Sequence, residues 1–274
     1  MARTSYRVRF QGSAGFELAG IVDRPDNQTD CPVAVFSHCF TCNKDLKAIV
    51  RISRALADHG IAVLRYDMTG LGGSDGVFCQ TNFTTNLADL SRAVHYAHAH
   101  IGPVTSLIGH SFGGAVSLAF AGQPVDDESR DKPHLKAVVT LAAPSDTHHL
   151  ANLLARRDPN IRLTGKGKVT IGGISWDIDQ QMLDDFERHD LPDRITRIKA
   201  ATLLFHSPTD ATVSFDHALR IMGLIQNGPG NQNPVSLISL QGADHLLVDP
   251  PEDLKFVADT MAAFLLRYAH PKVN

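Results

Sequence analysis

The sequence predicts an α/β fold, with a mostly parallel central sheet and helices on both of its faces. Short, nearly continuous apolar runs are typical of strands that are buried on both faces. Segments with helical spacing of apolar residues alternate with these runs, which implies right-handed crossovers between parallel strands. The length of 274 residues suits one such domain with a sizeable insertion. We therefore expect a single domain over residues 1–274.

The first two predicted strands differ from the others. Val8 to Phe10 and Phe16 to Val22 flank a segment with the composition of a hairpin turn, and they suit an antiparallel edge of the sheet. The buried strands are predicted at Val33 to Phe36, Ile61 to Tyr66, Val104 to Ile108, Ala137 to Leu141, Ala201 to Phe205 and Val235 to Leu240. Helices are predicted at Asp45 to His59, Asn82 to His100, Phe112 to Ala121, Phe215 to Gln226 and Pro251 to Tyr268.

One connection is too long for a simple crossover. The segment from Pro144 to Ile198 separates two predicted strands, so we expect a cap or lid over about residues 144–198. Within it, Val169 to Ile174 is predicted as part of a β-hairpin and Ile178 to His189 as a helix.

Composition disfavours several classes of protein. Lys and Arg number 26 against 29 Asp and Glu, for a net charge of −3, which argues against a general nucleic-acid or membrane binder. No apolar stretch is long enough to span a bilayer, and no segment resembles a signal peptide. Four cysteines in a chain of this length do not indicate a disulfide framework. We expect a cytoplasmic protein.

A Gly-x-Ser-x-Gly pattern centres on Ser111. An apolar strand runs into it and a helical segment leaves it, which is the context of a nucleophile elbow. Its glycines carry no Cβ where the turn forces strand and helix together. Ser74 lies in a second match to the same pattern, but no helix follows it and the many glycines there indicate a loop. Ser111 is therefore the predicted nucleophile.

A serine hydroxyl needs a base within hydrogen-bond reach and an acid that orients the base. Hydrolases with such an elbow carry these groups in the chain order Ser, acid, His. Asp210 and His245 each follow a predicted strand in that order, so both lie at the same sheet edge as Ser111. Asp244 and Asp249 are weaker candidates for the acid.

The oxyanion of acyl transfer requires two preorganised N–H donors. One is expected from Phe112, the residue after the nucleophile. The other is expected from the loop after the first buried strand, where position indicates the backbone N–H of Phe40. An alternative is that Phe40 serves only as a hydrophobic plug, and both roles are compatible because the donor is main chain.

The residues from His38 to Lys44 resemble the His-Gly-Phe-Thr-Gly-Asn-Lys oxyanion loop of bacterial feruloyl and cinnamoyl esterases, with Cys39 and Cys42 in place of the two glycines. The segments Leu56 to Asp67 and Gly70 to Gly76 are similar to the same group. A closer resemblance is to the hydrolase domain of α/β-hydrolase/OsmC fusion proteins. That group shares the His-Cys-Phe-Thr-Cys loop, the elbow, the His-Ser-Pro-x-Asp acid loop and the Ala-Asp-His-Leu-Leu histidine loop.

The resemblance spans nearly the whole chain and implies an α/β-hydrolase fold with Ser111, Asp210 and His245 as triad. It also implies no metal and no organic cofactor. Peroxide reduction is not expected, because the chain contains no OsmC-type segment. The two cysteines beside the oxyanion hole weaken any inference about feruloyl esters.

Two further features allow a functional or a structural interpretation. Cys39 and Cys42 form a Cys-x-x-Cys, but no second pair completes a zinc site and no thioredoxin-like pattern surrounds it. Oxidation of Cys39 is expected to disturb the oxyanion hole and inhibit the enzyme. Trp176, the only tryptophan, lies in the expected cap, where it either lines the substrate pocket or anchors the cap. Cys39 is the other candidate for the pocket wall.

The predicted function is a serine carboxylesterase that acts on a small or medium-sized ester through an acyl-enzyme on Ser111. Thioesters or C–C bonds are alternative substrates, because the same triad cleaves them and only the pocket differs. A non-catalytic role as binding or scaffold partner of an OsmC-type peroxide-detoxification protein is the alternative from another class. No nucleic acid or membrane partner is expected, and a homodimer stays open at family level.

Overall fold

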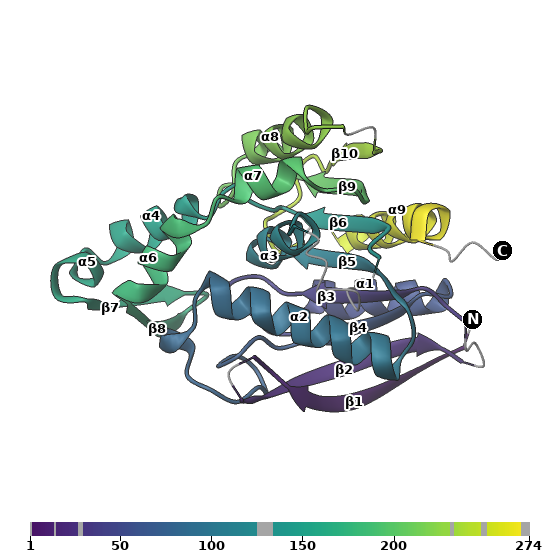
Figure 1. Cartoon of the computed structure of the whole chain (residues 1–274), viewed down its shortest axis with the longest axis horizontal. Coiled ribbons are helices and arrows are strands. Elements are labelled where there is room, and N and C mark those ends of the chain that lie inside the picture. The colour runs from purple at the N-terminus through teal and green to yellow at the C-terminus, as the bar shows by residue number, and fades with distance from the viewer. Residues whose placement is uncertain are drawn as a thin grey trace.

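The computed structural model describes residues 2–13, 15–26, 30–124, 134–230, 233–247 and 251–269. Its main sheet has eight strands in the order β1-β2-β4-β3-β5-β6-β9-β10 (Figure 1). The strands are β1 Arg3–Gln11, β2 Glu17–Pro25, β3 Val33–Ser37, β4 Ala62–Tyr66, β5 Val104–His110, β6 Ala137–Leu141, β9 Ala201–His206 and β10 Val235–Ser239. Only the pairs β1–β2 and β2–β4 are antiparallel. The predicted α/β fold is confirmed.

Helices cover both faces of the sheet, as Figure 1 shows. One face packs against α1 (Lys47–Asp58) and α9 (Pro251–Ala269), and the other against α2 (Phe83–His100), α3 (Phe112–Ala121) and α8 (Phe215–Gln226). A single 3-10 turn, η1 (Phe78–Gln80), precedes α2. Among the residues that the structure describes, no helix combines the length and apolar character that crossing a bilayer requires.

The continuous apolar runs reflect burial on both sides of the sheet. Along β3, Val33 and Val35 belong to the core on one face, whereas Ala34 and Phe36 belong to the core on the other. Side chains alternate along a strand, so a strand covered on both faces has no position that faces solvent. These two cores pack on opposite faces of the central strands, which fixes the positions from which the loops at their carboxyl ends begin.

The edge strands depart most from the sequence prediction. β1 begins at Arg3, five residues before the predicted start, and pairs with β2 from Arg3–Pro25 to Gln11–Glu17. Most of its side chains are exposed. An exposed edge strand lacks the apolar run that marks a buried one, and this explains the error in its predicted start.

Between β6 and β9, the chain forms a separate layer that we call the cap. It contains α4 (His148–Arg157), α5 (Asn160–Thr164), β7 (Lys166–Ile171), β8 (Ile174–Asp179), α6 (Gln180–Arg188) and α7 (Leu191–Thr196). The hairpin predicted there is present, with Gly172 and Gly173 at positive φ in its turn. The predicted helix begins two residues late, because Ile178 is the buried residue of β8. Helices α4, α5 and α7 were not predicted.

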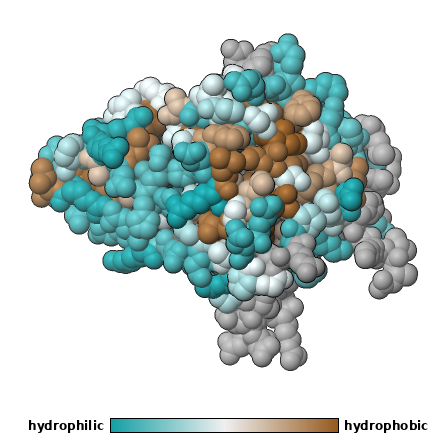
Figure 2. Space-filling view, turned by 90° about the horizontal axis from the view of Figure 1, so that it is seen from above, coloured by the Kyte–Doolittle hydropathy of each residue, from teal (hydrophilic) through white to brown (hydrophobic). Residues whose placement is uncertain are grey.

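The cap extends beyond the end of the sheet, at the left of Figure 1. Figure 2 shows that its upper face is mostly hydrophilic, whereas hydrophobic surface gathers over the middle of the molecule. Helix α7 returns to the main body, where it packs against α3 and α8. A side chain at Gly122 would place its Cβ 1.9 Å from the carbonyl oxygen of Arg194 in α7, so this return is a close backbone contact.

Candidate active site

Ser111 occupies a strained turn between β5 and α3. Its φ of 53° and ψ of −116° define a backbone conformation that a residue with a Cβ rarely adopts. This conformation costs about 1–3 kcal/mol of folding free energy. The turn is held because the Ser111 N–H donates to the carbonyl of Leu141 in β6, at 2.7 Å. It also requires glycine at 109, where a Cβ would lie 2.3 Å from the Gly113 carbonyl oxygen. The sharp strand-to-helix turn predicted at Ser111 is therefore present.

The structure brings Ser111, His245 and Asp210 into one hydrogen-bonded chain. The Ser111 Oγ donates to His245 Nε2 at 2.9 Å, and His245 Nδ1 donates to Asp210 Oδ2 at 2.7 Å. Asp210 is thus the acid that bonds to His245, and Asp249, one of the two weaker candidates, lies outside the described residues. Ser74, the alternative serine, instead donates to the Asp67 carbonyl and accepts from the Ala19 N–H.

The loop after β9 positions the carboxylate of Asp210, whose side chain is fully buried. Burial alone raises the pKa of Asp210, but the hydrogen bond and charge of His245, with the N–H groups of Val213 and Thr212, lower it below its ordinary value. His206, the last residue of β9, donates from Nε2 to the Val213 carbonyl at 2.8 Å and closes this loop. Asp210 is thus held ionised, with one oxygen aimed at His245.

A second histidine, His110, supports the loop that carries His245. It is the last residue of β5, 1 % exposed, and its Nε2 donates to the His245 carbonyl at 2.7 Å. Burial, together with the nearby His245, lowers the pKa of His110 to about 4, so its ring is neutral near pH 7. Neither His110 nor His206 was predicted from the sequence to support these loops. Their only signal was a histidine that closes an otherwise apolar strand.

The start of α3 lies against the loop after β3, which we call the oxyanion loop (His38–Lys44). A Cβ at Gly113 would lie 2.3 Å from the Ser37 carbonyl oxygen and 2.4 Å from that of His38. The rings of Phe40 and Phe112 pack edge to face, with centroids 5.5 Å apart. Phe112 is the first residue of α3, and the first N–H groups of a helix have no acceptor within it. Both predicted oxyanion donors therefore belong to segments in direct contact.

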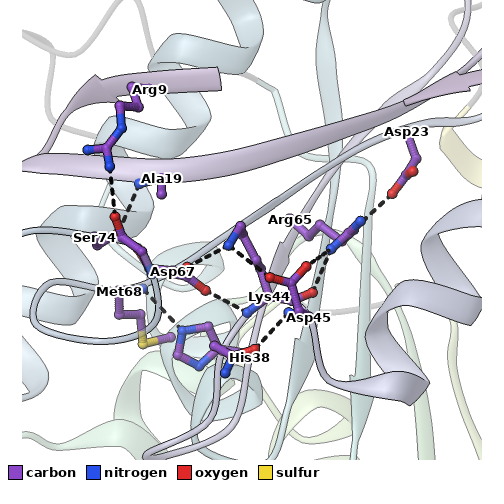
Figure 3. A network of polar contacts seen from close by, with 12 residues as sticks. Arg9, Ala19, Asp23, His38, Lys44, Asp45, Arg65, Asp67, Met68 and Ser74 are labelled. Carbon is purple, nitrogen blue, oxygen red and sulfur yellow. Dashed lines mark hydrogen bonds and ion pairs between the residues drawn. The ribbon is translucent and has the colours of Figure 1, made fainter. Parts of the chain in front are cut away.

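Buried polar groups anchor both ends of the oxyanion loop (Figure 3). At its start, His38 Nε2 accepts from the Met68 N–H at 3.1 Å, and Nδ1 donates to the Cys39 carbonyl at 2.8 Å. At its end, Asp67 accepts from the Lys44 backbone N–H at 2.6 Å and from Lys44 Nζ at 2.8 Å. Burial lowers the pKa of His38, so it serves as a neutral link.

A charged pair deeper in the sheet extends this anchor. Arg65, 2 % exposed, donates from Nε to Asp23 at 2.9 Å and from one terminal nitrogen to the Lys44 carbonyl and to Asp45. Burial opposes the charge on Lys44, but the hydrogen bonds and charges of Asp67 and Asp45 raise its pKa above the ordinary value. The end of the loop is thus tied to β2 and β4 through paired charges (Figure 3).

Cys39 and Cys42 are joined by a disulfide within the oxyanion loop, with Cα atoms 5.4 Å apart. Cys39 is buried and Cys42 is partly exposed. In the same structure Ser111, His245 and Asp210 form their chain of hydrogen bonds. Cys31 and Cys79 are free thiols.

Aromatic rings connect the cap to the nucleophile. Trp176 of β8 packs on Phe78 of η1 with centroids 4.8 Å apart, and Phe78 packs on Phe40 at 5.4 Å. Phe40 in turn contacts Phe112, the neighbour of Ser111. The indole N–H of Trp176 is buried and has no acceptor among the described residues. Trp176 therefore anchors the cap and also adjoins the side chains around the site.

Comparison with known proteins gives consistent findings. The family described as alpha/beta hydrolase fold matches residues 32–211. The esterase domain of a Rhodothermus marinus protein is 37% identical over 97% of this chain and 99% of its own, with a TM-score of 0.73. Est1E from Butyrivibrio proteoclasticus, solved with ferulic acid bound, is 22% identical over 95% of this chain and 98% of its own, with a TM-score of 0.74. The second likeness bears on the fold alone. No protein of curated function matches.

The contact between α3 and the oxyanion loop predicts that Gly113→Ala destabilises the protein by about 1–3 kcal/mol, because the new methyl group meets two carbonyl oxygens that cannot move freely. Gly223→Ala in α8 is the matched control. Open space surrounds Gly223, so alanine there leaves stability unchanged or raises it by about 1 kcal/mol. Urea unfolding measures both free energies. Equal stabilities for the two variants would contradict the close contact.

The pKa of His110 predicts a loss of stability in acid. The unfolded chain takes up a proton at this residue near pH 6.5, whereas the folded protein does so near pH 4. Stability therefore falls as the pH decreases from 6.5 to 4, by about 3 kcal/mol at most from this group. In His110→Gln the amide can still donate to the His245 carbonyl but does not titrate, so the pH dependence becomes shallower. Urea unfolding at pH 7 and pH 5 measures the loss of unfolding free energy in each protein. Equal losses in wild type and His110→Gln would refute the assignment.

Proposed function

The chain belongs to the alpha/beta hydrolase family and is a hydrolase of that superfamily, and on this basis we propose that it is a serine esterase. Its substrates are small to medium carboxylic esters, which react through an acyl-enzyme on Ser111. The observation that carries the proposal is the chain of two hydrogen bonds, 2.9 Å and 2.7 Å, from Ser111 through His245 to Asp210. This geometry suits a nucleophile, a base and an orienting acid.

In the proposed reaction, Ser111 Oγ attacks the ester carbonyl while His245 Nε2 takes its proton. His245 then returns this proton to the leaving alcohol, and the serine keeps the acyl group. Water then attacks the acyl-enzyme while His245 again takes and returns the proton, and the acid is released. Asp210 accepts from His245 Nδ1–H throughout, which keeps Nε2 free as the base and stabilises the imidazolium that forms. The lowered pKa of Asp210 supports this role, because the ionised carboxylate supplies the negative charge that stabilises the imidazolium.

We assign the oxyanion hole to the backbone N–H groups of Phe40 and Phe112. Preorganised donors are effective because they need no reorganisation when charge develops on the former carbonyl oxygen. The anchors of the oxyanion loop support such rigidity. So does the contact of Gly113 with the Ser37 and His38 carbonyls, which keeps the loop beside the start of α3.

The substrate pocket is assigned to the space between the cap and the elbow, with Trp176 and Cys39 near its wall. The run of aromatic rings from Trp176 to Phe112 supports an acyl group of limited size, with apolar or aromatic character. Ferulic acid bound to the structurally similar Est1E makes an aromatic acid a useful member of a substrate panel. A thioester would fit the same machinery, and the panel includes one.

The proposal extends to domain organisation and location. We take residues 1–274 as a single hydrolase domain with its cap at about 144–198, supported by the packing of α7 on α3 and α8. The proposal includes a cytoplasmic location, in which Cys31 and Cys79 stay free thiols and the Cys39–Cys42 disulfide would be of the redox-sensing kind that occurs in that compartment.

Ser111→Ala is expected to lower turnover of p-nitrophenyl acetate by about 10⁴- to 10⁶-fold, because the triad acts as a unit. It also abolishes covalent labelling by a fluorophosphonate. Ser74→Ala is the control, since it alters the other Gly-x-Ser-x-Gly match but removes only the hydrogen bonds of the Ser74 hydroxyl to the Asp67 carbonyl and from the Ala19 N–H. Steady-state hydrolysis and labelling followed by intact mass measure both effects. An active Ser111→Ala protein would overturn the serine mechanism.

Trp176→Ala is expected to lower kcat/KM for aromatic and medium-chain esters by about tenfold, because an apolar wall contributes roughly 1–3 kcal/mol to binding. The acetate ester, which is too small to reach Trp176, keeps its rate. Leu163→Ala is the matched change in the cap, at a side chain that is 78% exposed, and it leaves the whole panel unaltered. A uniform loss across all esters would show that Trp176 only anchors the cap.

A further inference from the structure

The disulfide lies at a strained turn in the oxyanion loop. The Cys42 N–H donates to the Cys39 carbonyl at 3.2 Å, which closes a four-residue turn over Cys39, Phe40, Thr41 and Cys42. Thr41, in the third position, has a φ of 60°. Phe40 is not among the described residues with positive φ, so the turn is of type II, which normally takes glycine at its third position.

A β-branched residue at positive φ is unfavourable by about 1–3 kcal/mol and persists only where its surroundings impose the conformation. Here the Thr41 hydroxyl donates to the Phe40 carbonyl at 2.6 Å, but this contact is local to the turn. The disulfide is the covalent link between the first and last residues of the turn. It is therefore well placed to hold Thr41 in this conformation.

The segments on either side of the turn are fixed by other contacts. His38 is held by Met68, and Lys44 is held by Asp67 through both its backbone and its side chain. A change in the turn is therefore confined to Cys39–Cys42. This stretch contains Phe40, whose N–H we assign to the oxyanion hole.

We propose that the Cys39–Cys42 disulfide is a positioning device for the oxyanion hole, and that its reduction by a dithiol or a phosphine lowers turnover. The inference rests on the proposed esterase function. With the bond open, only the hydrogen bond from the Cys42 N–H to the Cys39 carbonyl closes the turn, so Thr41 can leave positive φ and the turn can open, which moves the Cys39–Phe40 peptide that carries the Phe40 N–H. The Phe40 backbone is then no longer held at the reacting carbonyl. The sign is opposite to the one expected from the sequence, because the oxidised pair is the competent form.

The reduction is ordinary thiol–disulfide exchange. A thiolate of the dithiol attacks the partly exposed Cys42 sulfur, and the bond to the buried Cys39 sulfur breaks. The second thiolate of the dithiol then displaces Cys42 from the mixed disulfide. Two electrons pass to the protein, Cys39 and Cys42 each gain a proton, and the dithiol ends as a disulfide. A phosphine instead attacks one sulfur and releases the other as a thiolate, and water then converts the phosphine to its oxide and frees the second thiol.

The test compares oxidised and phosphine-reduced wild type on p-nitrophenyl acetate. Intact mass after iodoacetamide treatment counts the thiols and shows which state is present. Reduction is expected to lower kcat by about 10- to 100-fold with little change in KM, because one oxyanion donor contributes roughly 10²- to 10³-fold. Reoxidation restores the rate. A reduced enzyme with unchanged kcat, or a protein whose pair stays reduced after mild oxidation, would overturn the proposal.

Thr41→Gly separates positioning from general stability. Glycine adopts a φ of 60° without strain, so the ratio of reduced to oxidised kcat in this variant is expected to approach one. Equal losses in wild type and Thr41→Gly would show that the bond does not act through the turn. Cys79→Ser, which removes the partly exposed free thiol, keeps the wild-type response. Failure of the esterase function itself would look different, since the oxidised protein would then neither hydrolyse esters nor label at Ser111.

Discussion

The parallel register of the central strands is the constraint on which the site depends. His110 pairs with Leu141, Leu141 with Phe205, and Phe205 with Ile238, so four strands end in one row. Backbone hydrogen bonds continue the row past the strands, from Ser111 to Leu141 at 2.7 Å and from Leu240 to His206 at 2.9 Å. Residues far apart in sequence therefore meet because the sheet aligns the points at which their loops begin. Without this alignment, the contact between Ser111 and His245 would require long loops to bridge the distance between their strands.

Polar residues in the interior serve the loops more than the sheet. Arg65 and Asp67 lie in or just after β4, yet their partners include Lys44 at the end of the oxyanion loop. His110 and His206 similarly end buried strands and bind carbonyls of the loops that carry His245 and Asp210. Burial of such groups is favourable only when they are hydrogen bonded. Each therefore holds its loop in one conformation, and a loop that shifts would leave a buried polar atom without a partner.

The sequence predicted the main sheet because both of its faces are buried, which leaves an unmistakable apolar pattern. It also predicted which side chains meet, since the order of Ser111, Asp210 and His245 and their positions after strands depend only on chain topology. It could not predict contacts that depend on three-dimensional packing. His110 looks like any histidine, β1 lacks apolar alternation where it is exposed, and pairing of Cys39 with Cys42 requires the turn geometry. The helices α5 and α7, of five and six residues, are too short to show a helical period.

The cap enters after β6 and returns at β9, and these two strands are hydrogen-bonded neighbours in the sheet. The insertion therefore takes the place of an ordinary crossover without altering the order of the strands or their register. Its length and sequence can change through evolution while the row of strand ends stays intact. The cap, which we propose as part of the substrate pocket, can in this way vary separately from the strands that carry Ser111 and Asp210, and exchange of the cap between relatives would test whether it sets specificity.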